Sequence, residues 1–201
     1  MDDPDNEHVI QNLLARAARM SRGHADFFDW PEKDQKEFGI AEEALLSIGL
    51  TRGKLLSRGA DDPHDCEHRN WLGSIGLEIT EFVDQASIEH LKRTGVASSR
   101  FWNKREFHEQ LGSIVKRKDS TDQLFGRPYL AYFLVVHCDE LSVSYQMAAE
   151  FLKGMRFEAR IIDEIIFLFS YDPARQSYPS IRIRCSWWQR PAHWWNRLRL
   201  R

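Results

Sequence analysis

The sequence predicts an α/β fold, a three-layer sandwich in which helices flank both faces of a mixed central sheet. Short segments typical of strands are separated by amphipathic segments of ten or more residues, which favours alternating strands and helices. The 201 residues are enough for one domain with a single core. No internal repeat or linker divides the chain, so residues 1–201 are interpreted as one domain.

The first third of the chain predicts two helices and a short strand. Residues 7–20 repeat apolar side chains at helical spacing, and Gly23 suits the end of this N-terminal helix. A second helix is expected over residues 31–50, with Pro31 in its first turn. The segment KLLS at 54–57 is a candidate strand within a turn-rich region.

Two further strands are expected next, CEHRNWL at 66–72 and GSIGLEITEFVD at 73–84, joined by a turn near Gly73. Residues 85–93 predict a short helix. The segment NKREFHEQLGSIVKRK at 103–118 predicts a longer helix with one apolar stripe.

The last third predicts three strands and one helix. YLAYFLVVH at 129–137 is continuously apolar, which is typical of a strand covered on both faces. SVSYQMAAEFLKGM at 142–155 predicts a helix that begins after Ser142 or Ser144. EIIFLFSY at 164–171 and SIRIRCSW at 180–187 predict the two final strands.

Composition limits the class of protein. The longest apolar runs are too short to cross a bilayer, so no transmembrane segment is expected. The acidic start MDDPDNEH does not resemble a secretory signal. Three cysteines without a CxxC pair favour a reducing, cytoplasmic location over a disulfide framework.

Glu78 lies in the middle of an otherwise apolar strand, where an ionised carboxylate is costly unless it is paired. Strand alternation puts Glu78 and Thr80 on one face, and pairing with the preceding strand brings Asp65 close to Glu78. A divalent cation relieves the repulsion between two carboxylates, and Mg²⁺ commonly takes one or two of them. The alternative is a solvated Glu78 on an edge strand and an Asp65 that serves a turn.

Pro63-His64-Asp65 and Glu78-Ile79-Thr80, with the order of elements over residues 34–137, resemble the PD-(D/E)XK nuclease superfamily. The resemblance implies a restriction-endonuclease-like fold in which Asp65 and Glu78 bind Mg²⁺, or Mn²⁺ in its place. It also implies a further carboxylate from the preceding helix, for which the candidates are Glu43 and Glu42. A lysine in the motif would orient the attacking water or stabilise charge on the phosphate.

The chain departs from that pattern at two positions. A histidine separates Pro63 from Asp65, and Thr80 stands where the motif has lysine, so the hydroxyl supplies no charge. Some members of the superfamily resemble this chain in taking the missing cation from the neighbouring helix. Lys118 continues the apolar stripe of the helix at 103–118 and is expected to reach inward, whereas Lys116 is less well placed. If neither reaches the site, the chain is a catalytically inactive relative.

Two other groups are candidates for chemistry. His64, Cys66 and His68 alternate along one predicted strand and suggest a zinc corner, but no second cluster completes four ligands, and packed or solvated side chains are the favoured interpretation. Asp139 and Glu140 follow a predicted central strand, where loops often carry function. A polar end to a buried strand is the alternative interpretation.

The tail at residues 186–201 contains four of the seven tryptophans and several arginines. Aromatic and arginine side chains together stack on bases and neutralise phosphates. They also suit an interface with a protein partner or a second copy of the chain, a membrane surface, or packing within the domain.

These observations predict a Mg²⁺-dependent nuclease that hydrolyses phosphodiester bonds, with DNA expected rather than RNA. Because the formal net charge is −2, attraction for nucleic acid has to be local. The alternative is a catalytically inactive nuclease-fold module that binds a protein or nucleic acid through its Trp/Arg-rich tail.

Overall fold

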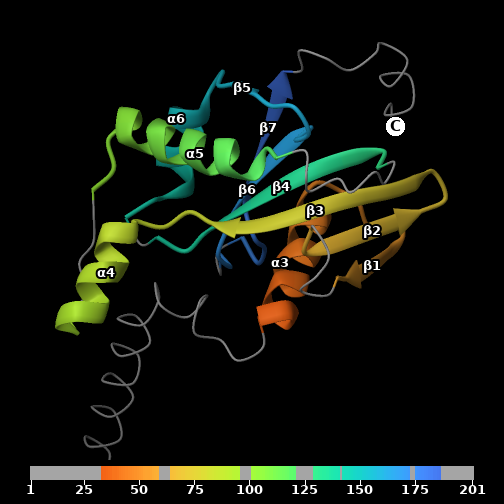
Figure 1. Cartoon of the computed structure of the whole chain (residues 1–201), viewed down its shortest axis with the longest axis horizontal. Coiled ribbons are helices and arrows are strands. Elements are labelled where there is room, and N and C mark those ends of the chain that lie inside the picture. Colours follow the sequence, from red (N-terminus) through yellow and green to blue (C-terminus); the bar gives the residue numbers. More distant parts are fainter. Residues whose placement is uncertain are drawn as a thin grey trace, which may run out of the picture.

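The computed structural model describes residues 33–58, 64–95, 101–120, 129–140, 142–172 and 175–186. They form an α/β structure with a seven-stranded mixed sheet in the order β1-β2-β3-β4-β6-β7-β5 (Figure 1). The predicted α/β class with a mixed central sheet is confirmed. The helix predicted at 7–20 and the tail beyond Ser186 lie outside the described residues.

An antiparallel meander forms one end of the sheet. It consists of β1 (Lys54–Ser57), β2 (Cys66–Asn70) and β3 (Gly73–Glu81). The β2–β3 turn is closed by the side chain of Asn70, whose Oδ1 accepts the backbone N–H groups of Leu72 and Gly73 at 2.9 and 3.2 Å. Gly73 has φ 143°, and a Cβ there would lie 2.8 Å from the side chain of Leu130. The turn therefore requires glycine, and it fixes the register of β2 against β3.

Two helix-containing crossovers build the rest of the sheet. After α4 (Gln85–Thr94) and α5 (Lys104–Lys118), β4 (Ala131–Cys138) runs parallel to β3. After α6 (Tyr145–Leu152), β6 (Glu164–Phe169) runs parallel to β4, and β7 (Ser180–Ser186) returns antiparallel to β6. The two-residue β5 (Phe157–Glu158) pairs with β7 and was not predicted.

Local capping explains where two of the helices begin. Asn103 and Glu106 form a capping box at the start of α5, which satisfies backbone N–H groups that the first turn leaves unpaired. Ser144, rather than Ser142, caps α6 by accepting the N–H of Met147 at 3.2 Å.

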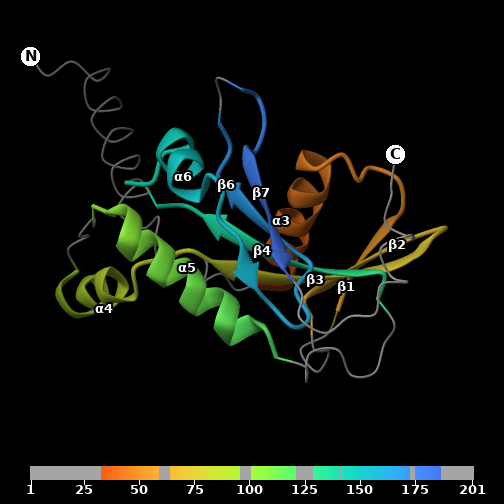
Figure 2. The same cartoon turned by 90° about the horizontal axis from the view of Figure 1, so that it is seen from above.

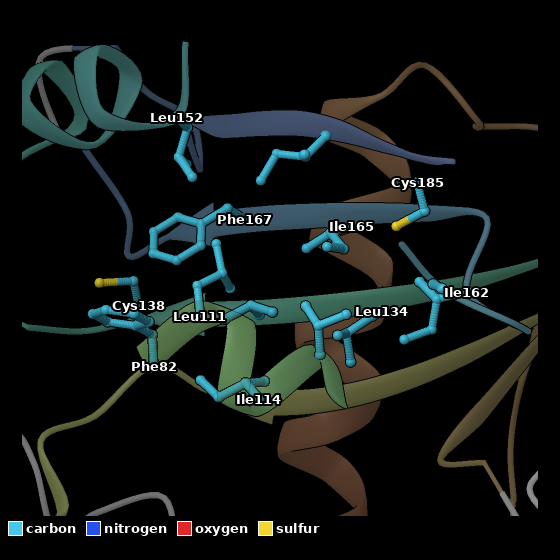
Figure 3. Packing of buried hydrophobic residues seen from close by; sticks show 14 of the residues in the cluster. Phe82, Leu111, Ile114, Leu134, Cys138, Leu152, Ile162, Ile165, Phe167 and Cys185 are labelled. Carbon is cyan, nitrogen blue, oxygen red and sulfur yellow. The ribbon is translucent and has the colours of Figure 1, made fainter. Parts of the chain in front are cut away.

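Helices lie on both faces of the sheet (Figures 1 and 2). The helix α3 (Lys33–Ser47) packs on one face, where Ile40, Ala44 and Leu45 join an apolar cluster with alternate residues of β3 and β4. On the other face α5 and α6 pack over a second, larger cluster, shown in Figure 3, that includes Phe82, Leu111, Leu134 and Phe167. Every residue of β4 is buried, as its continuous apolar sequence predicts.

The two clusters define which way each side chain of β3 points. Leu77 and Ile79 belong to the α3 side, whereas Phe82 belongs to the α5 side. Because side chains alternate along a strand, Glu78 and Thr80 lie on the α5 side and Glu81 on the α3 side.

The described residues bear on two expectations from composition, which concern membrane-spanning segments and disulfide bonds. None of the described helices has the length and apolar character that crossing a membrane requires. Cys66, Cys138 and Cys185 are buried as free thiols.

Candidate active site

Asp65 and Glu78 converge where β2 begins. The last β2–β3 pair is Cys66 with Leu77, so the next residue outward, Asp65, comes opposite Glu78. The Oδ2 atom of Asp65 accepts the backbone N–H of Ile79 at 2.7 Å, and its carbonyl accepts the N–H of Arg58 at 2.9 Å. Asp65 is therefore held on both sides by neighbouring strands.

Glu78 is 4% exposed, and both of its carboxylate oxygens have partners. Lys118, the last residue of α5, forms an ion pair and hydrogen bond with Oε1. The hydroxyl of Tyr132, on β4, donates to Oε2 at 3.3 Å. Lys118 therefore reaches inward from its helix to Glu78.

The charges of this group influence one another. Burial raises the pKa of Glu78 above its usual range, and the neighbouring charge of Asp65 raises it further, while Lys118 opposes both effects. Burial also raises the pKa of Asp65. The hydrogen bond from the backbone N–H of Ile79 and the charge of Lys118 lower it in part. The charge of Asp65 thus disfavours the ionised form of Glu78, and burial disfavours the ionised form of both carboxylates, an arrangement that favours binding of a further positive charge.

The helix α3 carries a buried carboxylate, Glu37, which was not among the residues predicted beside Glu43. Glu37 is buried, pairs with Lys33 at 3.2 Å, and has its pKa raised by burial and then by the charge of Asp65. Glu43 is half-buried and Glu42 is exposed. At about 100° per residue, Glu43 lies about 240° around α3 from Glu37.

The sequence contains a pattern that indicates the burial of Glu37. The buried residues of α3 repeat at spacings of three and four, and Glu37 is the polar residue that begins this stripe before Ile40, Ala41 and Ala44. A carboxylate at the start of a buried stripe points toward the sheet, whereas Glu43 falls outside the stripe.

Thr80 lies two residues beyond Glu78, buried on the same face of β3. It occupies the position where the motif has lysine. The cation beside Glu78 comes instead from Lys118.

Comparisons with known proteins do not name a family. No protein-family model matches the chain, and searches of the curated proteins and of the solved structures gave no match. Function is therefore inferred from Asp65, Glu78 and Lys118 themselves.

The residues of the suggested zinc corner do not share one face of the sheet. The Nε2 atom of His64 lies 3.0 Å from the hydroxyl of Tyr129, whose ring belongs to the α5-side cluster. Cys66 belongs to the α3-side cluster. Within the described ranges, no three His, Cys, Asp or Glu side chains are grouped so that they would hold a metal ion.

A second set of buried polar residues lies at the ends of β3 and β4. Glu81 and His137 are paired in the β3–β4 register, and Lys36 of α3 lies 3.8 Å from Glu81. Asp139 accepts a hydrogen bond from the hydroxyl of Ser170 at 2.6 Å, and Glu140 accepts the N–H of Asp84 at 2.9 Å. Asp139 and Glu140 thus tie loops together at the strand ends.

Proposed function

We propose that this chain is a Mg²⁺-dependent nuclease with a restriction-endonuclease-like fold, which hydrolyses phosphodiester bonds in nucleic acid. The observation that carries the proposal is the convergence of Asp65 and Glu78 from adjacent strands on the charge of Lys118. The chain order of helix α3, the β1–β2–β3 meander, helix α5 and parallel strand β4 supports it, because that order accompanies the motif in the superfamily that the sequence resembles.

The donor set suits a hard divalent cation. Asp65 and Glu78 offer carboxylate oxygens, and Mg²⁺ commonly uses one or two protein carboxylates and completes its shell with water and phosphate oxygens. Mn²⁺ accepts the same ligands. Such an ion, when bound, supplies polarisation of the phosphodiester and a lower pKa for a bound water. Glu37, whose pKa is raised by burial and then by the charge of Asp65, would hold a water rather than serve as a third ligand.

Lys118 has two roles in this proposal. In the free protein its charge lowers the pKa of Glu78 and so favours the ionised carboxylate that a metal ion requires. With a substrate bound, its ammonium group would stabilise the negative charge that develops on the phosphate oxygens. The hydroxyl of Thr80, on the same face, would orient a water but supply no charge.

Tyr132 is a positioning residue for Glu78. Its hydroxyl donates to Oε2 of Glu78, and its ring lies over Gly76, where a Cβ would come within 2.8 Å of the ring carbon Cδ2. The absence of a side chain at Gly76 lets the ring approach β3, and the ring carries the hydroxyl to Glu78.

The test uses the purified full chain with plasmid, single-stranded DNA and RNA, in Mg²⁺ or Mn²⁺ and then in EDTA. We expect cutting of DNA that requires metal and is lost in Asp65→Asn and in Glu78→Gln. Lys118→Met should lower kcat by about 10²- to 10³-fold, the usual effect of removing one charge-stabilising group. Glu109→Gln is the matched control, because this glutamate of α5 is 66% exposed. Metal-dependent cutting that survives Glu78→Gln would reject this site.

The second candidate is the inactive nuclease-fold module. The observation that favours it is that Lys118 and Tyr132 already engage both oxygens of Glu78, so the ion pair serves the fold without a metal. Calorimetric titration with Mn²⁺ separates the two functions. The nuclease should bind Mn²⁺ through Asp65 and Glu78, whereas a module shows neither Mn²⁺ binding nor cutting.

A further inference from the structure

The turn between β2 and β3 presents a large aromatic side chain to solvent. Trp71 in this turn is 89% exposed, and the turn lies at the end of the sheet remote from α4 (Figure 1). A single exposed aromatic side chain requires no explanation by itself. Trp71 differs from such a residue because charged side chains lie beside it.

Two cations are placed opposite each other next to Trp71. The β1–β2 register pairs Lys54 with Arg69, and both side chains are exposed. Like charges directly opposite on neighbouring strands destabilise a sheet. Glu67 offsets part of this charge, because its Oε1 atom accepts a hydrogen bond from Nε–H of Arg69 at 2.5 Å, but it also pairs with Arg58. These four residues thus comprise three cations and one anion.

This basic strip leads to the candidate active site. Side chains alternate along β2, so Arg69 and Glu67 lie on the same face as Asp65, and their partners on β1 share that face. From Asp65 to Trp71 is six residues of extended chain and turn, a span of about 20 Å at about 3.3 Å per residue. A bound strand that passes Asp65 and follows β2 would therefore meet the cations first and Trp71 last.

We propose that the exposed Lys54 and Arg69 of this basic strip bind the backbone of the substrate strand, and that Trp71 stacks on a base with an exposed face. The nature of the ligand rests on the proposed function. The cations neutralise phosphates, and the indole provides a π-surface that accepts any base. Because Trp71 reaches only an unstacked base, the substrate class is single-stranded nucleic acid or a duplex end. Because about 3.4 Å per nucleotide is the spacing of a fully stacked strand, that base lies at most about six nucleotides from the scissile phosphate.

A protein partner fits the same surface less well. The centre of a protein interface is typically depleted of charged residues, whereas the neighbours of Trp71 along the strip are Arg69 and Lys54. The excess of cations matches a polyanion.

Binding is measured first, without metal, so that it does not depend on catalysis. The probe is a fluorescein-labelled 20-nucleotide single strand, titrated with the full chain in EDTA at several salt concentrations. We expect Trp71→Ala to weaken binding by about 5- to 150-fold, the effect of losing one base–aromatic stack. Lys54→Gln should reduce the slope of log affinity against log salt by about 0.7, as expected for one lost phosphate contact with a single strand.

Phe101→Ala is the matched control, because Phe101 is an equally exposed aromatic residue at 87% and precedes α5. Thermal unfolding of each variant checks that the fold is intact. Equal affinity of Trp71→Ala, Phe101→Ala and the wild type would overturn the proposal. Absence of binding by the wild type to single strands and duplex ends, even at low salt, would also overturn it and assign Trp71 to a protein partner.

Cleavage in Mn²⁺ then separates this inference from the proposed function. On a substrate with one free end, we expect the wild type to cut at a fixed position within about six nucleotides of that end and Trp71→Ala to cut at scattered positions. If Trp71→Ala cuts at the same positions as the wild type and binds the strand with the same affinity, the proposed role of the basic strip and Trp71 is refuted while the nuclease proposal stands. Binding that depends on Trp71, with no metal-dependent cutting, supports the strip and refutes the nuclease.

Discussion

Replacement of Glu81 by glutamine should stabilise the protein at alkaline pH, because the wild-type carboxylate is buried with little compensation. Glu81 is 8% exposed, and its Oε2 atom has no hydrogen-bond partner in the described part of the chain. Burial raises its pKa to about 8, and the charges of Asp139 and Glu140 add to this effect, while Lys36 opposes it. At neutral pH the folded protein therefore holds a proton on Glu81 that the unfolded chain has released.

The sign and size of the effect follow from this difference. Between the ordinary pKa of 4.5 and the raised value of about 8, the folded state binds more protons than the unfolded state. The contribution of Glu81 to the free energy of unfolding therefore falls as pH rises, by about 1.36 kcal/mol per pH unit. The loss reaches about 3 kcal/mol at pH 7 and about 5 kcal/mol above pH 8. Glutamine does not ionise, so Glu81→Gln lacks this loss.

The assay is urea unfolding, followed by circular dichroism, at pH values from 5 to 8.5. Glu81→Gln and the wild type should differ little at pH 5 and diverge steadily above it, with the variant more stable. Glu150→Gln, an exposed glutamate of α6, controls for the loss of one negative charge. A variant that is no more stable relative to the wild type at pH 8 than at pH 5 would refute the reasoning.

Three further outcomes follow from buried charges. Lys118→Met should cost about 3 kcal/mol of unfolding free energy at pH 8, because it leaves the buried carboxylate of Glu78 without its cation. The loss should shrink in acid, where Glu78 is protonated, and in the double variant with Glu78→Gln. Burial lowers the pKa of His137 to about 4, so between pH 4 and 6.5 the folded state binds fewer protons than the unfolded state. The free energy of unfolding of the wild type should therefore rise by about 3 kcal/mol over this range. His137→Gln should lack this rise, which urea unfolding across the range measures. Glu37→Gln should reduce metal-dependent cutting more than Glu43→Gln, because the charge of Asp65 acts on Glu37, and equal rates for the two would contradict a role for Glu37 at the site.

Most of the fold was predictable because burial leaves a pattern in the sequence. The continuous apolar run of β4 reflects helices on both faces, and the alternation in β3 reflects its two different clusters. The short turn from Asn70 to Gly73 set the β2–β3 register, so the approach of Asp65 to Glu78 followed from sequence spacing. β5 escaped prediction because two residues are too few to show any periodicity, and only their pairing with β7 defines them.

The candidate site was predictable where a single element decides the direction of a side chain. Lys118 continues an apolar stripe of α5, so it points toward the sheet. Glu37 was not among the predicted residues, because the resemblance to known nucleases implies a glutamate within the helix, whereas Glu37 lies at the start of its buried stripe. The burial of Glu81 depends on how α3 packs over the ends of β3 and β4, which local sequence does not encode.

The position of the cation gives the candidate site a different physical character from one with lysine in the strand. A lysine at the place of Thr80 would lie on a covered face of β3, where burial of its ammonium group is costly. Lys118 stands at the carboxyl end of α5 with 24% of its side chain exposed, so it keeps part of its hydration and lies at the helix end that favours positive charge. Its distance from Glu78 then depends on the packing of Leu111 and Ile114 against the sheet. In this protein the apolar core beneath α5 therefore sets the electrostatics of the two carboxylates.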